Sequence, residues 1–138
     1  MKRVILMVAL LATYFIASAQ FSSGVKLPSV VGDSVKTGAL TVTKYISLSA
    51  GYSTVSVQPV LTKASGTVLA GIKLYGTVDG TNYVQIGDSI ACTNITTNTS
   101  IWTLTNTSYA KLKIVYKGYG TMSAYSTTWY LVRKRITE

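Results

Sequence analysis

Apolar and polar side chains alternate along most of this chain, and after residue 20 apolar residues nowhere recur at helical spacing. In the clearest run, residues 109–117, Leu112, Ile114 and Tyr116 fall on one face and lysines on the other. Alternation with period two indicates a β-strand with one buried face. Such runs recur about every ten residues with Gly or Asn turns between them. The pattern predicts an all-β fold, an antiparallel β-sandwich or jelly-roll-like single domain of roughly seven to nine strands.

Individual strands are expected over residues 40–48, 52–61, 89–94, 101–104, 109–117 and 123–135, the last being the longest. Residues 63–66 and 118–120 are expected to form turns, and the Thr- and Asn-rich residues 94–100 a loop. Pro59 lacks an amide donor, which indicates a sheet edge or a strand end. Cys92 is the one cysteine. We expect it to be a small buried hydrophobe in a strand, although an odd cysteine also allows an intermolecular disulfide.

Residues 69–86 predict a strand, a tight turn and a second strand. Asp79-Gly80 is a strong hairpin signal, because Gly accepts the positive φ that a hairpin turn needs. Residues 72, 74, 76 and 78 fall on one face of the first strand. The predicted turn motif consists of Asp79, Gly80, Asn82 and Tyr83.

The first 19 residues differ in character from the rest. Lys2 and Arg3 precede the uncharged apolar residues 4–17, and residues 17–19 read Ala-Ser-Ala. These features are typical of a secretory signal peptide; an uncleaved membrane anchor is the alternative. Residues 20–38 are expected to form an extended N-terminal arm or a short edge strand, and residues 39–138 the β-sandwich domain. The protein is therefore expected to be exported to the periplasm, cell surface or medium, or to be part of a virion.

Basic residues outnumber acidic ones, 13 to 4. Loss of Lys2 and Arg3 with the leader would lower the formal net charge from +9 to +7. A cationic surface attracts acidic polysaccharide or a negatively charged cell surface. The basic surface is assigned to Lys111, Lys113, Lys117, Arg133, Lys134 and Arg135. Most basic residues stand singly, unlike the dense patch of a nucleic-acid binder.

Residues for catalysis are scarce. Histidine is absent from the sequence, and the acids ahead of the terminal Glu138 are Asp33, Asp79 and Asp88. Asp79 and Asp88 occupy turn positions that Asp favours for backbone reasons alone. No triad or phosphate-binding motif is present, and scattered acids are too few for a metal site. We expect no enzymatic activity, no cofactor and no metal.

Four aromatic residues are candidates for a ligand site or a protein interface: Trp102, Tyr119, Tyr125 and Trp129. Exposed Tyr and Trp side chains stack on sugar rings and anchor protein contacts. The alternative is a place in the core or in a cross-strand pair. For Trp129 we favour the core, whereas Tyr119 and Tyr125 flank a Gly turn and are expected to be more exposed.

The sequence Leu-Tyr-Gly-Thr-Val-Asp-Gly-Thr-Asn-Tyr-Val at residues 74–84 resembles a recurrent motif of small β-sandwich proteins from bacteriophage particles and Bacteroidota surface proteins. The resemblance extends over residues 66–135, including the strand at 109–116 and the basic end at 131–134. It implies a structural or adhesive role, such as a fibre, capsid-surface or appendage subunit.

Two functions follow as hypotheses. The first is a non-enzymatic exported subunit that self-assembles as a homo-oligomer or joins other structural subunits, with residues 20–38 as the strand donor. The alternative is a secreted carbohydrate-binding β-sandwich module.

Overall fold

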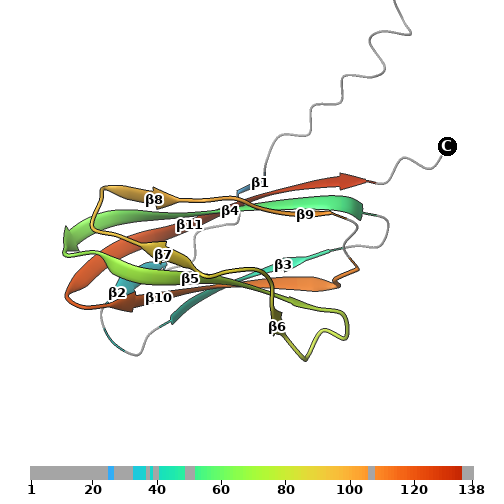
Figure 1. Cartoon of the computed structure of the whole chain (residues 1–138), viewed down its shortest axis with the longest axis horizontal. Helices are drawn as coiled ribbons and strands as arrows, with labels where there is room; N and C mark the ends of the chain where they lie inside the picture. Colours follow the sequence, from blue (N-terminus) through green and yellow to red (C-terminus); the bar gives the residue numbers. More distant parts are fainter. Residues whose placement is uncertain are drawn as a thin grey trace, which may run out of the picture.

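The computed structural model describes residues 25–26, 33–36, 38, 41–48, 52–105 and 108–134, and the predicted leader at residues 1–19 lies outside them (Figure 1). The strands are β1 (Val25–Lys26), β2 (Ser34–Lys36), β3 (Thr41–Ser47), β4 (Tyr52–Gly66), β5 (Leu69–Thr77), β6 (Val84–Gln85), β7 (Ile90–Cys92), β8 (Thr97–Thr99), β9 (Trp102–Thr105), β10 (Lys111–Tyr119) and β11 (Met122–Lys134). Within the described residues, no helix is long and apolar enough to cross a membrane.

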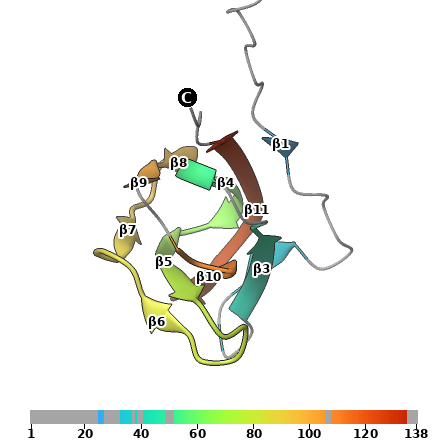
Figure 2. The ribbon, with the colours of Figure 1, turned by 90° about the vertical axis from the view of Figure 1, so that its right-hand side faces the viewer.

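Two antiparallel sheets form the predicted β-sandwich, and Figure 2 shows the two layers end-on. The six-stranded sheet has the order β1-β11-β4-β8, with β2 also paired to β11 and β9 to β4. The five-stranded sheet has the order β3-β10-β5-β6, with β7 also paired to β5. The pairing is nested along the chain, since β2 pairs with β11, β3 with β10, β4 with β8 and β9, and β5 with β6 and β7. This wrapping confirms the jelly-roll-like fold.

The core lies between the sheets and is built from inward side chains of both. Leu112, Ile114 and Tyr116 of β10 are buried, as the alternation predicts. Tyr116 crosses the core: its hydroxyl lies 2.7 Å from Thr128 Oγ1 and donates to the Thr127 carbonyl at 3.0 Å. A buried hydrogen bond therefore joins the two sheets at β10 and β11.

The N-terminal part contributes to the sandwich further upstream than the predicted boundary at residue 39. Val35 of β2 is fully buried, and β2 pairs with residues 123–125 of β11. Asp33, which precedes β2, forms an ion pair with Lys44, with 2.6 Å between Asp33 Oδ1 and Lys44 Nζ. Both side chains are largely removed from solvent. Since Lys44 belongs to β3, the ion pair links the two sheets. Residues 33–36 are thus part of the folded domain, and β2 is the short edge strand that was the alternative to an extended arm.

Several predicted strand limits are wrong for one physical reason. Residues 63–66 and 97–99, expected as a turn and a loop, are strand, and β4 rather than β11 is the longest strand. These segments are polar and small, so they lack the apolar alternation of a half-buried strand. They nevertheless pair in register, 63–66 with the start of β11 and 97–99 with residues 60–62. Similarly, β10 extends through Tyr119, so that the turn falls at Gly120.

Pro59 lies in the middle of β4, which has paired strands on both sides, so the prediction of a sheet edge or a strand end at this residue is wrong. On one side it pairs with Thr128 of β11. On the other side β9 ends its pairing at Val57 and β8 begins at Val60, so Pro59 faces the gap between two short strands. The missing amide therefore coincides with a local break in the ladder, which explains how a central strand accommodates proline.

Candidate functional site

The predicted turn motif forms an ordered loop between β5 and β6. β5 ends at Thr77 and β6 begins at Val84, so a loop of six residues, 78–83, connects them rather than a tight two-residue turn. Gly80 has φ of 80°, the positive value that the sequence predicts. Val78 lies beyond the strand and is exposed, so it does not extend the buried face of β5.

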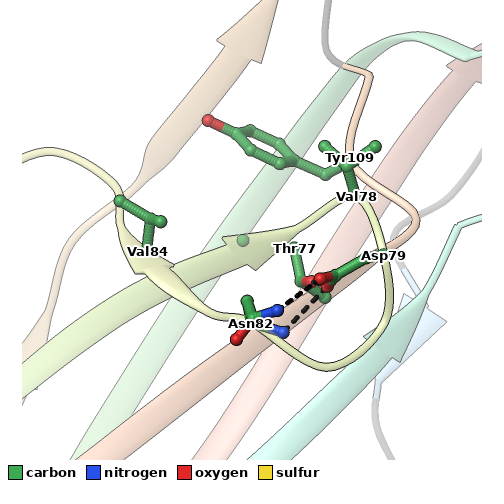
Figure 3. A pocket seen from close by; sticks show the side chains of 7 residues that line it. Thr77, Val78, Asp79, Asn82, Val84 and Tyr109 are labelled. Atoms are coloured by element: carbon green, nitrogen blue, oxygen red, sulfur yellow. Dashed lines mark hydrogen bonds between the residues drawn. The ribbon is translucent and has the colours of Figure 1, made fainter.

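Asp79 organises this loop, as Figure 3 shows. Its Oδ1 accepts hydrogen bonds from Thr77 Oγ1 at 2.7 Å and from the amides of Thr81 and Asn82 at 2.8 Å each, and its Oδ2 accepts from Asn82 Nδ2 at 2.6 Å. These donors stabilise the carboxylate, with Thr77 the largest contributor, and hold the pKa of Asp79 well below its usual 3.8. The carboxylate is committed to the loop backbone, which makes it a structural group.

An open pocket of about 310 Å³ lies beside this loop. Gly76, Thr77, Val78, Asp79, Asn82, Val84 and Tyr109 line it (Figure 3). Asp79 and Asn82 are hydrogen-bonded to each other, and the other lining residues carry no charged group. We regard it as a by-product of the loop rather than as a binding site.

The four candidate aromatics do not gather in one place. Trp102 is partly buried and packs against the core from the inward side of β9. Tyr119 is exposed on the outer face of the five-stranded sheet. Tyr125 and Trp129 are exposed by 59% and 40% on the outer face of the six-stranded sheet. The core interpretation of Trp129 is therefore wrong.

Tyr116 provides the physical reason for the position of Trp129. The inward residues of β11 opposite Tyr116 are small: Ala124, Ser126 and Thr128, all buried. The volume between the sheets is filled from the other side by the Tyr116 ring, whose hydroxyl reaches Thr128. The aromatic residues Tyr125 and Trp129 consequently point outward, whereas Tyr130 packs against the core.

A groove of about 380 Å³ runs beside Trp129 on the outer face of the six-stranded sheet. Its lining residues are Ser56, Gln58, Ile101, Thr103, Trp129, Tyr130 and Leu131. The register places Gln58 directly opposite Trp129, and Ser56 between Leu131 and Thr103. Ser56 and Thr103 hydroxyls lie 3.4 Å apart, and Gln58 Nε2 donates to Thr99 Oγ1 at 3.3 Å. An indole thus stands beside a row of neutral hydrogen-bonding groups.

We call this surface the neutral aromatic face, defined by the outward residues of β4, β8, β9 and β11. Its members are Thr54, Ser56, Gln58, Val60, Thr62, Thr97, Thr99, Thr103, Thr105, Tyr125, Thr127, Trp129, Leu131 and Arg133. Arg133, at one end, is the charged residue of these four strands' outward positions. Beyond them, the exposed Lys36 of β2 lies opposite Ser123, and the backbone of Lys26 of β1 pairs with Trp129. Tyr125 and Trp129 lie four residues apart on one side of β11, which separates them by roughly 13 Å.

The predicted basic residues are likewise divided. Lys111, Lys113 and Lys117 lie on the outer face of the five-stranded sheet, whereas Arg133 lies on the other sheet. The backbone of Lys134 ends β11, and Arg135 lies outside the described residues. The prediction of one basic surface is therefore wrong, because the described basic residues lie on two different sheets.

Cys92 is buried, as expected, and burial raises the pKa of its thiol to about 11. Within the described part of the chain, no three His, Cys, Asp or Glu residues come together as metal ligands would. Asp33 is engaged with Lys44 and Asp79 with its own loop, so these two acids have structural roles.

Sequence reasoning did not identify Gln58, Ser56 or Thr103 as site residues. Each is an ordinary polar residue on the outward phase of a strand, and its position beside Trp129 depends on pairing between segments far apart in the chain. The sequence did indicate that Ser56 and Gln58 point outward, because they alternate with the apolar Val55 and Val57.

No family model and no curated protein matches this chain. Solved structures of similar shape include one described under CBM4 structure and function, with 14% identity and a TM-score of 0.41, covering 69% of this chain and 61% of the other. They also include chains of the infectious bursal disease virus T13 particle and Gx strain, each with 14% identity, at TM-scores of 0.48 and 0.45. This chain is covered to 82% and 85% in these two matches but spans only 29% and 32% of the viral chains. The two-sheet fold is established by the strand pairings of this chain and not by these likenesses.

Proposed function

We propose that this protein is a non-enzymatic, exported recognition module that binds an uncharged polysaccharide through its neutral aromatic face. The arrangement of Trp129 beside Gln58, with Tyr125 farther along the same strand, carries the proposal. Indole and phenol rings pack on the apolar faces of sugar rings, while amide and hydroxyl groups bond the sugar hydroxyls. The groove volume of about 380 Å³ lies in the range of small-molecule sites.

The extended shape of the face favours a polymer over a single sugar. Trp129 and Tyr125 are separated by roughly 13 Å along β11, so one sugar ring cannot contact both. Thr127 and Thr62 lie on the same face between and beside the two rings. A linear chain following β11 would contact both aromatic residues and the hydroxyl groups between them.

Affinity gel electrophoresis and calorimetry of the full chain with hydroxyethyl cellulose and xylan test this function. We expect Trp129→Ala to weaken binding at least tenfold, as removal of a central aromatic contact does. Tyr125→Ala should weaken it less. Tyr119→Ala is the matched control, because Tyr119 is exposed on the opposite sheet. Equal effects of Trp129→Ala and Tyr119→Ala, or no retardation by any uncharged polymer, would contradict the assignment.

A second candidate function is assembly by strand exchange, which the outer edge of β11 favours. This edge pairs with β2 at residues 123–125 and with β1 at Trp129 and Tyr130, so short segments from the N-terminal part cover it. An edge of this kind accepts a strand from another copy. The resemblance of the hairpin motif to that of phage-particle and surface β-sandwich proteins supports the same hypothesis.

The mass of the chain from Gln20 onward, measured by light scattering with and without residues 20–32, tests assembly. This deletion ends before Asp33, because Asp33 and Val35 belong to the core of the domain. We expect defined oligomers from the longer chain and folded monomers from the shorter one. Identical masses for the two chains would exclude the arm as the donor.

A further inference from the structure

The outer face of the five-stranded sheet differs in chemistry from the neutral aromatic face. It carries four lysines and four tyrosines: Lys73, Lys111, Lys113, Lys117, Tyr45, Tyr75, Tyr83 and Tyr119. We call this surface the lysine–tyrosine face. β3, β5 and β10 contain no acidic residue, and the described acids Asp33, Asp79 and Asp88 lie outside these strands. The charged residues of these three strands are therefore all basic.

The lysines form a regular row along β10. Lys111 and Lys113 are two residues apart on one side of the strand, a spacing of roughly 6.7 Å. The next outward position is Val115, and the register places Lys73 of β5 directly opposite it. Lys117 follows two residues later. Four lysine positions therefore follow one another at nearly equal intervals over roughly 20 Å. Lys73, on the neighbouring strand β5, provides the third of them.

Tyrosine rings hold two of these ammonium groups, those of Lys113 and Lys117, in place. Lys113 Nζ lies 4.8 Å from the Tyr75 ring centroid and 4.3 Å from that of Tyr83, and Lys117 Nζ lies 5.4 Å from the Tyr119 centroid. Such cation–π contacts restrict flexible lysine side chains, which lowers the entropy lost when an anion binds. The Tyr45 and Tyr83 rings also contact each other, at a centroid distance of 6.3 Å.

We propose that the lysine–tyrosine face is a second binding site, for a linear acidic polysaccharide that carries a carboxylate on its repeating units. A row of lysines at evenly spaced strand positions is complementary to a polymer with regularly spaced negative charges. Phenol hydroxyls between the lysines supply donors and acceptors for the sugar hydroxyls. This site lies on the opposite sheet from the groove beside Trp129, so the two sites are independent.

The geometry favours this polymer over a single-stranded nucleic acid. Nucleic-acid bases stack on free aromatic ring faces, and bidentate phosphate contacts favour arginine. Here lysine ammonium groups occupy ring faces of Tyr75, Tyr83 and Tyr119. β3, β5 and β10 contain no arginine. The face therefore presents point charges rather than a stacking platform.

Binding of the full chain to polygalacturonate, measured by calorimetry at low and at physiological salt, tests the proposal. We expect Lys113→Gln combined with Lys117→Gln to weaken the affinity about tenfold, and we expect binding of the unmodified chain to weaken as salt rises. The matched control combines Lys36→Gln with Arg133→Gln, which removes the same charge from exposed positions on the six-stranded sheet. Thermal melting of both double variants checks that each is folded.

Retained affinity in the control and loss in the Lys113–Lys117 variant would support the site. Trp129→Ala should leave polygalacturonate binding unchanged, which separates this site from the proposed neutral glycan site. Equal losses in the two double variants would show a net-charge effect and overturn the proposal. Tighter binding to single-stranded DNA or to phosphatidylserine vesicles than to polygalacturonate would also overturn it, as would no binding at all.

Discussion

The buried hydrogen bond between Tyr116 and Thr128 joins the two sheets, and removing it should measurably weaken the domain. Both residues are fully buried, and the phenol oxygen lies 2.7 Å from Thr128 Oγ1 and 3.0 Å from the Thr127 carbonyl. Tyr116→Phe leaves the Thr128 hydroxyl without this partner in an environment that water does not reach. Such a loss costs about 1–3 kcal/mol, a large part of the 5–15 kcal/mol that stabilises a typical domain.

A double-mutant cycle isolates this contact from the change in volume. Thr128→Val alone removes the other hydroxyl, and the double variant removes both. We expect the double variant to be less destabilised than the sum of the single variants, with a coupling energy of about 1 kcal/mol. Urea unfolding followed by tryptophan fluorescence gives the free energies. A coupling energy near zero would refute the role of this contact in joining the sheets.

The change of stability at alkaline pH tests the burial of Tyr116 independently. Burial, the largest cause, raises the pKa of Tyr116 far above its usual 10.0, and the bond to Thr128 only partly opposes this effect. The folded protein therefore keeps the phenol neutral where the unfolded chain ionises it. This stabilisation is complete below pH 10 and is lost above it, by about 1.4 kcal/mol per pH unit. Stability should fall less steeply above pH 10 in Tyr116→Phe; equal slopes would contradict the burial of this phenol.

Four further predictions concern other parts of the fold. Asp33→Asn leaves the buried Lys44 ammonium unpaired and should cost about 3–5 kcal/mol by urea unfolding, whereas a loss under 1 kcal/mol would mean that the ion pair is solvated. The pKa of Asp79 is depressed in the folded state, so the stability that its carboxylate contributes is present above pH 3.8 and lost as the pH falls. The melting temperatures of the native protein and Asp79→Ala should therefore converge at acid pH, and a constant difference would count against the hydrogen-bonded loop. The thiol of Cys92, with its raised pKa, should react with iodoacetamide at pH 8 only after denaturation, and rapid labelling of the folded chain would disprove its burial. Gly76→Ala places a Cβ 2.7 Å from Ile86 Cδ1 and from the Tyr109 ring, and should cost about 1–3 kcal/mol; an unchanged midpoint in denaturant would show that the ring moves aside freely.

The alternation of side chains predicted the fold class and the faces of β10, because a strand with one buried face leaves a local trace in the sequence. It did not predict the second half of β4, where small polar residues pair with β11 without an apolar stripe. The phase of β11 was correct, but its inward face was assigned wrongly. That choice depends on Tyr116, 13 residues earlier than Trp129, filling the space between the sheets.

The binding faces were less accessible to sequence reasoning than the core. The tyrosines and lysines are visible as residue types, but their grouping depends on register between strands that are distant in the chain. Lys73 completes the lysine row only because it lies opposite Val115, and Gln58 joins the groove only because it lies opposite Trp129. No local pattern encodes these pairings.

The nested pairing of strands also determines when the protein can fold. Asp33 and Ser126, 93 residues apart, are hydrogen-bonded where β2 meets β11, so the sandwich closes only after β11 has left the ribosome. Contacts between such distant residues make folding slow, on the order of milliseconds to seconds. A polypeptide terminated before β11 would lose the central partner of β4 and of β2 together, leaving a 15-residue strand with an unpaired edge. Incomplete chains should therefore aggregate or be degraded rather than persist as a smaller domain.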